Sequence, residues 1–144
     1  QTMFAEFELI MGRMIGEGKT LTADVLCEEY KKLNALYYGP DMVVDDEIAM
    51  EWARIPHFYY NFYVYQYATG FSAATALAAG ILKDVNKEEA GATEKYLDFL
   101  KSGGSDYPLN ILKKAGVDLT DSAVIQSALD VFAEKVTQME AVFN

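Results

Sequence analysis

The sequence contains few of the side chains that build metal sites and nucleophilic active sites. Its 144 residues include one cysteine, Cys27, and one histidine, His57. A catalytic zinc site takes about three protein ligands, usually histidine, cysteine or carboxylate side chains. No His-Glu-x-x-His motif and no Gly-x-Ser-x-Gly motif is present. We therefore predict that these residues bind no metal by themselves and supply at most half of a hydrolytic active site.

Basic side chains are scarce as well. Lys and Arg together number 12 against 22 Asp and Glu, which gives a formal net charge of −10 at pH 7. Nucleic acids bind clustered Lys and Arg, so we expect no nucleic-acid partner. A lone cysteine allows no internal disulfide, which agrees with a cytoplasmic location. We expect Cys27 to be a buried structural thiol rather than a nucleophile.

Strand signals are nearly absent, whereas helical periodicity recurs along the whole chain. No low-complexity linker divides it, so we predict an all-α fold and a single helical unit over residues 1–144. The apolar spacing starts at Phe4 with no preceding cap, which we interpret as entry into the middle of a larger domain. Besides the long uncharged run described next, we expect five helices. The first ends near Glu17, the second runs from Thr22 to Gly39, and the third runs from Asn86 to Gly103. The fourth occupies residues 105–116, and the last starts after Thr120 or Asp121.

The longest run without a charged side chain follows Arg54 and ends at Leu82. The part from Phe58 to Leu82 is long enough to span a bilayer. Polar side chains are scattered through it, however, and its tyrosines crowd into one half instead of forming belts at both ends. We favour a buried helix of a packed core, with Pro56 in its first turn, and expect no membrane partner.

Five tyrosines follow His57 within this run. At about 100° per residue, Tyr59, Tyr63 and Tyr67 share one helical stripe, which Tyr60 joins. Phe58, Phe62 and Tyr65 form another stripe, to which His57 is angularly closer. A buried phenol needs a hydrogen-bond partner, so the cluster indicates either an internal polar network or a polar cleft. Core packing is the simpler interpretation for each single tyrosine. His57 is the better functional candidate, because imidazole and phenol together can donate hydrogen bonds to a developing oxyanion.

Three stretches resemble a known family. They are QTMFAEFE at residues 1–8, WARIPHFYYNFYVYQYATGFSAA at 52–74 and YLDFLKSGGSDYPLNILKKAGVD at 96–118. Together they are similar to the C-terminal part of the oligoendopeptidase F group, zinc metallopeptidases related to thimet oligopeptidase. The resemblance implies a largely helical enzyme that cuts short peptides inside a deep channel. It also implies a zinc ion held by two histidines and a glutamate, which we expect in the preceding portion of the same protein.

The resemblance also implies roles for individual residues. The family has a histidine and a tyrosine that stabilise the tetrahedral intermediate, and the matching positions are His57 and Tyr65. Tyr60 and Tyr63 are the corresponding candidates for substrate binding.

Several expectations concern the isolated chain. We expect it to be inactive, because the metal ligands would come from elsewhere in the protein. Its partners would be short peptide substrates and the missing N-terminal portion, and the isolated chain would self-associate through exposed apolar surface. The alternative is a helical binding or structural module without catalysis.

Overall fold

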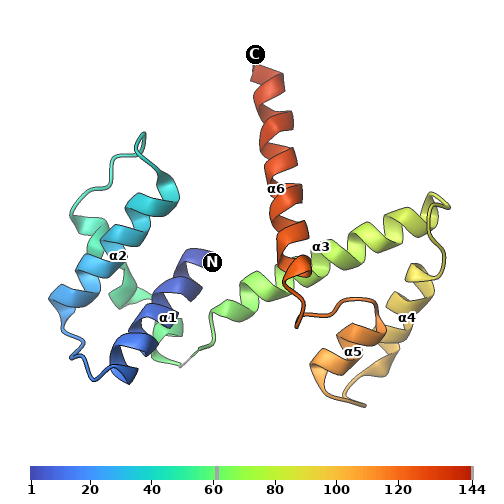
Figure 1. The fold of residues 1–144 in the computed structure, drawn as a ribbon, viewed down its shortest axis with the longest axis horizontal. Coiled ribbons are helices and arrows are strands. Elements are labelled where there is room, and N and C mark those ends of the chain that lie inside the picture. Colours follow the sequence, from blue (N-terminus) through green and yellow to red (C-terminus); the bar gives the residue numbers. More distant parts are fainter. Residues whose placement is uncertain (61, 144) are drawn as a thin grey trace. The chain divides into compact units, whose positions relative to one another are not determined.

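The computed structural model describes residues 1–60 and 62–143. Over these residues it contains α-helices and 3-10 helices and no strand, so the all-α prediction is confirmed (Figure 1). The α-helices are α1 (Thr2–Gly16), α2 (Ala23–Tyr38), α3 (Tyr65–Val85), α4 (Ala92–Ser102), α5 (Pro108–Lys114) and α6 (Ser122–Phe143). The 3-10 helices are η1 (Glu47–Arg54) and η2 (Pro56–Tyr59).

The contacts within the chain divide it into two compact units, residues 1–68 and residues 69–144. The boundary falls inside α3, so the first turn of this helix belongs to the first unit and the remainder to the second. The single-unit assignment from the sequence stays a prediction, and each unit is described by itself below.

The first unit is built on the packing of α1 against α2 and of α2 against η1. Apolar residues at helical spacing bring one face of each long helix together, and Tyr30 and Phe7 are fully buried there. Trp52 of η1 packs against this core and donates its indole N–H to the Cys27 sulfur at 3.4 Å. The half-buried thiol thus has a structural partner. The buried core residues are Met3, Phe7, Leu26, Tyr30 and Leu33.

The ends of α2 lie where local sequence signals predict them. The Thr22 hydroxyl accepts a hydrogen bond from the Val25 backbone N–H at 3.3 Å, which caps the first turn. Gly39 follows the last helical residue with φ +78°, a conformation that a side chain disfavours. Both predicted ends of this helix are confirmed.

The prediction of one helix through the long uncharged run is wrong for its first part. Pro56 does occupy a first-turn position, but of the short helix η2, and the α-helix begins only at Tyr65. Phe62 lies between them with φ +51°, in the left-handed region. This conformation costs a non-glycine residue roughly 1–2 kcal/mol and cannot continue a right-handed helix. Packing of the aromatic side chains in this segment against α1 and against His57 offsets the unfavourable backbone conformation of Phe62.

The helix expected to start at Asn86 starts later, at Ala92, so that prediction is wrong at its N-terminal end. The preceding helix α3 continues to Val85, and the chain then turns through Lys87 at φ +64°. Asp84 at the end of α3 accepts a hydrogen bond from the Thr93 N–H at 2.7 Å. This bond caps α4 from a different helix, and it holds the pKa of Asp84 below its ordinary value.

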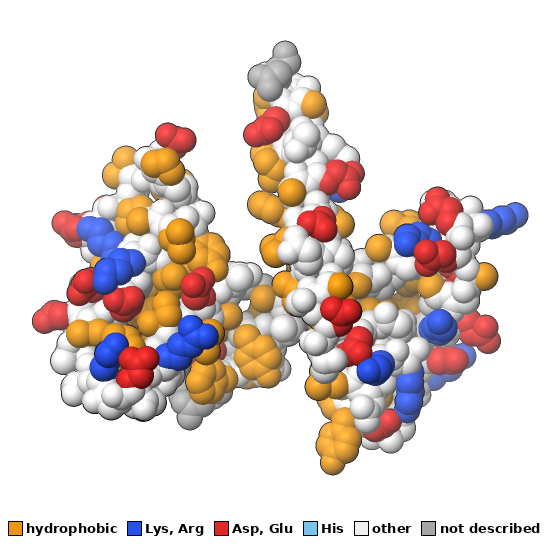
Figure 2. All heavy atoms as spheres, in the orientation of Figure 1, with side chains coloured by type: hydrophobic (Ala, Val, Ile, Leu, Met, Phe, Trp, Pro, Cys, Tyr) orange, Lys and Arg blue, Asp and Glu red, His pale blue; other side chains and the backbone are white. Residues whose placement is uncertain are grey.

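The second unit contains a compact α4–α5 pair and a long helix, α6. Gly116 ends the α5 turn with φ +96°, and the Asp121 carboxylate accepts a hydrogen bond from the Ala123 N–H at 2.9 Å at the start of α6. Both ends were predicted from the sequence. Figure 2 shows hydrophobic side chains gathered along one side of α6. Over the described residues, no helix combines the length and apolarity needed to cross a membrane.

Candidate functional site

His57 is positioned by the aromatic residue beside it. Phe58 packs edge-on against Phe4 and Phe7 of α1, with ring centroids 5.6 Å and 5.1 Å apart. Edge-to-face aromatic pairs of this kind are favourable beyond the area they bury. Because Phe58 and Ile55 are anchored in the first unit, the half-buried imidazole of His57 is held at a defined place on its surface.

Three tyrosine rings surround the imidazole. Tyr63 stacks on it at a centroid distance of 5.5 Å and an interplanar angle of 13°. Tyr67 and Tyr60 meet it edge-on, at 5.4 Å and 6.4 Å. The four residues His57, Tyr60, Tyr63 and Tyr67 are called the His57 cluster below. All of them belong to the first unit.

A hydrogen bond joins the cluster chemically. The Tyr67 hydroxyl lies 3.1 Å from His57 Nε2, and the tautomer of the imidazole decides which group donates. Partial desolvation and the Tyr63 hydroxyl raise the pKa of Tyr67 above its ordinary value of 10.0. The phenol therefore stays protonated at neutral pH and keeps a proton to donate.

The cluster is accessible rather than sealed in a core. Tyr60 is 64% exposed, Tyr63 42% and Tyr67 40%. Within these 144 residues, ordinary core packing, the simpler interpretation of these tyrosines, therefore does not describe them. Each ring contacts its neighbours in the cluster and keeps a large part of its surface exposed.

Tyr65 is the first residue of α3. It lines a hollow of about 470 Å³ together with Phe62, residues of α1 and Tyr37. On the wall of this hollow, the Tyr37 hydroxyl donates to Glu6 at 2.7 Å, and burial followed by this bond raises the pKa of Tyr37 to about 12. The structure thus brings Tyr60 and Tyr63 beside His57, and places Tyr65, which the sequence analysis paired with His57, in a neighbouring hollow. The roles of these residues stay predictions.

Tyr67 was not among the residues singled out for the site. The four-residue spacing from Tyr63 to Tyr67 was a usable signal, but it depended on where the helix begins. With α3 starting at Tyr65, Tyr67 sits in its first turn and reaches back to the imidazole. The helical start therefore decides which phenol meets His57.

The side chains at hand do not fit a zinc site. Over the residues that the structure describes, no three His, Cys, Asp or Glu side chains are grouped so that they could hold a metal ion.

Comparison with known proteins gives a consistent result over nearly the whole chain. The model of peptidase family M3 matches residues 1–131. Oligopeptidase PepF of Bacillus subtilis is 54% identical over 140 residues, which is 97% of this chain and 20% of that protein. An oligoendopeptidase F homolog of Borreliella burgdorferi is 44% identical over 144 residues, all of this chain and 24% of that protein.

A solved structure agrees with this. The crystal structure of oligoendopeptidase-F from Enterococcus faecium is similar at a TM-score of 0.87 and 49% identity. It covers 99% of this chain, and this chain covers 27% of it. The 144 residues thus span between a fifth and just over a quarter of the length of these relatives.

Proposed function

The chain belongs to peptidase family M3, and on that premise we propose that it is the C-terminal part of the catalytic domain of a zinc-dependent endopeptidase that hydrolyses short peptides. The names of the relatives, oligopeptidase and oligoendopeptidase F, support this substrate class. Because the chain spans 20% of the Bacillus subtilis relative, the zinc ligands would lie in polypeptide outside these 144 residues. The lone Cys27 supports a cytoplasmic location.

The His57 cluster would stabilise the transition state of peptide hydrolysis. Attack on a peptide bond builds negative charge on the former carbonyl oxygen, and donors placed beforehand around that oxygen lower the barrier. The observation that carries this proposal is the 3.1 Å approach of the Tyr67 hydroxyl to His57 Nε2 on an accessible surface. The two groups thus lie side by side, and their mutual hydrogen bond would be exchanged for bonds to the substrate oxygen when both donate to it. Tyr63, stacked on the imidazole, would keep its plane oriented.

The second donor beside His57 has two candidates. The family resemblance gives this role to Tyr65, whereas the contacts of the imidazole favour Tyr67. In our proposal Tyr67 is the donor that acts with His57, and Tyr65 contacts the peptide from the hollow that it lines with Phe62. Tyr60 and Tyr63 would contact substrate at the rim of the cluster.

Substitutions in the complete enzyme test these roles. His57→Ala and Tyr67→Phe should each lower kcat on the order of 10²–10³-fold, with smaller changes in KM, because a transition-state donor is lost. Tyr65→Phe should have the smaller effect on kcat. Tyr59→Phe is the matched control, since the Tyr59 hydroxyl bonds the Ala53 carbonyl rather than His57. Unchanged turnover in the His57 and Tyr67 variants would remove the proposed role, and a larger loss in Tyr65→Phe would return the role to Tyr65.

The isolated 144-residue chain should be inactive. Incubation with a short fluorogenic peptide and added zinc should give no cleavage above that of buffer. Measurable turnover that a chelator abolishes would contradict the proposal that the metal ligands lie elsewhere. Binding of the peptide without turnover, in the complete protein as well, would favour the alternative of a helical binding module.

A further inference from the structure

Glu8 is a buried acidic side chain on α1, only 5% exposed. A carboxylate removed from water needs hydrogen-bond donors, or its burial is unfavourable. Its Oε1 accepts a hydrogen bond at 3.2 Å from the backbone N–H of Tyr63, which lies 55 residues later in the chain. The donor residue is the one whose ring stacks on His57. Glu8 is therefore joined to the cluster by the backbone of one of its members.

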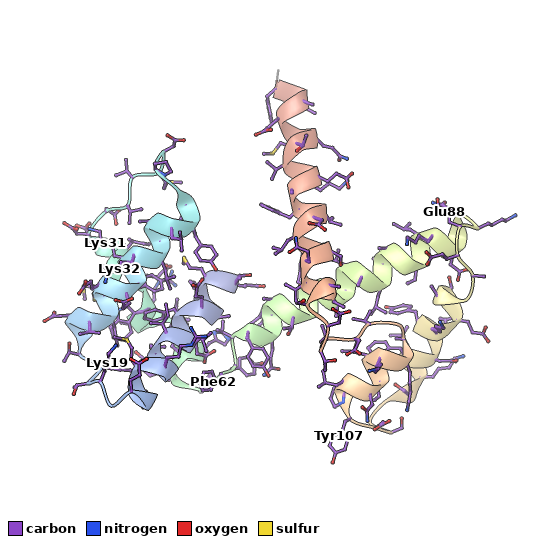
Figure 3. All side chains as sticks on the ribbon, viewed as in Figure 1. Lys19, Lys31, Lys32, Phe62, Glu88 and Tyr107 are labelled. Carbon is purple, nitrogen blue, oxygen red and sulfur yellow. The ribbon has the colours of Figure 1, made fainter. Side chains whose placement is uncertain are left out.

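A second contact attaches the same segment to α1. The ring of Phe62, labelled in Figure 3 between η2 and α3, lies against Gly12, where an added Cβ would come within 2.7 Å of Phe62 Cζ. Gly12 thus leaves the space that this ring occupies. Phe62 holds φ +51°, a conformation that persists only where its surroundings impose it. The close contact with α1 is one such constraint.

These anchors lie along one face of a single helix. At about 100° per residue, these residues fall within an arc of less than half the circumference of α1; they are Phe4, Phe7, Glu8 and Gly12. Phe4 and Phe7 hold Phe58, which directly follows His57. One face of α1 therefore contacts the chain on both sides of the cluster.

We propose that Glu8 is a positioning residue, which fixes the backbone of Tyr63 and through it the orientation of the His57 imidazole. Glu8 bonds the loop and not the imidazole, so it acts through the stacked ring. The inference rests on the proposed function of His57 and gives a role to a residue to which the family resemblance assigned none. Small displacements of a catalytic group are costly, since an error of about 1 Å can lower a rate on the order of 10²-fold.

Two variants of Glu8 in the complete enzyme separate its charge from its acceptor oxygen. Glu8→Ala removes the acceptor for the Tyr63 N–H and should lower kcat about 10- to 100-fold, with little change in KM. Glu8→Gln keeps an acceptor oxygen of the same reach and should retain most of the activity. Glu17→Ala is the matched control, because that carboxylate is exposed and pairs with Lys19. A loss in Glu8→Ala no larger than in Glu17→Ala would overturn the proposal.

A double-mutant cycle with His57→Ala distinguishes positioning from general destabilisation. If Glu8 acts through His57, the double variant should be about as slow as His57→Ala alone, because the misplaced group is already absent. Equal fold-losses in both backgrounds would overturn the positioning role and leave the proposed function intact. No effect of His57→Ala by itself would instead contradict the proposed function.

Gly12→Ala gives a test that does not depend on Glu8. Alanine is a better helix former than glycine, so the substitution favours α1 while it pushes Phe62 away. We expect kcat to fall, and we expect the melting temperature to stay close to that of the wild-type enzyme. Gly16→Ala is the control on the same helix, since an added Cβ there meets nothing within 4 Å. Full activity in Gly12→Ala would contradict the claim that α1 sets the loop.

Discussion

At the residue scale, two carboxylates of the second unit, one on each side of α5, are held by lysines of α5 and by N–H groups close to them in the chain. Asp106 bonds Lys114, Asn110 and the Tyr107 N–H, and these contacts lower its pKa from 3.8 to about 2. Asp118 bonds Lys113 and Thr120, which lowers its pKa to about 2 as well. Both groups are at the surface, so solvent screens their contribution to stability. Their importance lies in how they order the turns around α5.

These shifts predict a dependence of stability on acid. Because the pKa in the folded state is lower than the ordinary value of 3.8, the stabilisation is fully present above that pH and is lost as the pH falls toward about 2. The melting temperature of the chain, followed by circular dichroism, should fall between pH 4 and pH 2. The melting temperature of the Asp106→Asn variant should fall less steeply over this range. Asp98→Asn, which removes an exposed ion pair with Lys101, should follow the wild-type curve.

At the scale of elements, the first unit depends on the attachment of η1 to α2. The hydroxyl of fully buried Tyr30 donates to Glu51 Oε2 at 2.7 Å, and Glu51 also pairs with Arg54. Burial, followed by this bond, raises the pKa of Tyr30 well above its ordinary value. The position of η1 matters for the site, because η2 and His57 follow it directly.

Removing the Tyr30 hydroxyl should weaken this attachment. Tyr30→Phe leaves the ring in the core but deletes a hydrogen bond to a charged acceptor, which contributes roughly 1.5–3 kcal/mol. The free energy of unfolding of the chain, from urea titration, should fall by about this amount. Tyr38→Phe changes an exposed tyrosine of the same helix and should change stability by less than about 0.5 kcal/mol. Equal effects of the two variants would contradict the role given to the Tyr30–Glu51 bond.

At the scale of the whole molecule, the apolar stripe of α6 has a large exposed area. Phe132 is 68% exposed, Met139 57% and Phe143 83%, and they follow one another on one side of the helix. Exposed apolar surface of this extent is typical of an interaction face. The chain spans about a quarter or less of its curated relatives, so in the complete protein we expect further polypeptide to cover this stripe.

Self-association of the isolated chain is the corresponding prediction. Sedimentation velocity should show a mass average that rises with concentration, because the stripe buries apolar area only in an oligomer. The double variant Phe132→Ser, Met139→Ser should reduce this rise. Gln138→Ser, about a third of a turn around α6 from the stripe, should not. A monomer at every concentration tested would show that the stripe does not associate.

Local chemistry in the sequence predicted most of the helix boundaries. Thr22 and Gly39 delimit α2, and Asp121 caps α6, because capping and left-handed C-terminal turns involve residues only a few positions apart. The start of α4 was missed, since its cap comes from Asp84 of another helix. His57 could be named as a candidate from its rarity and its place after Pro56, whereas Tyr65, the tyrosine that the sequence paired with it, lines a neighbouring hollow.

The sequence by itself thus determined the all-α class and the family, and it named His57 as the candidate residue on which the proposed site is built. Only the tertiary structure decided which phenol bonds that histidine, and it did so by ending η2 early and starting α3 at Tyr65. The backbone conformation of Phe62 that interrupts the helix is locally unfavourable, so the hydrophobic periodicity of the sequence does not predict it. It is stabilised by Gly12 and Glu8 of α1, the latter 55 residues away from its partner Tyr63, and contacts over such separations form only when the helices pack.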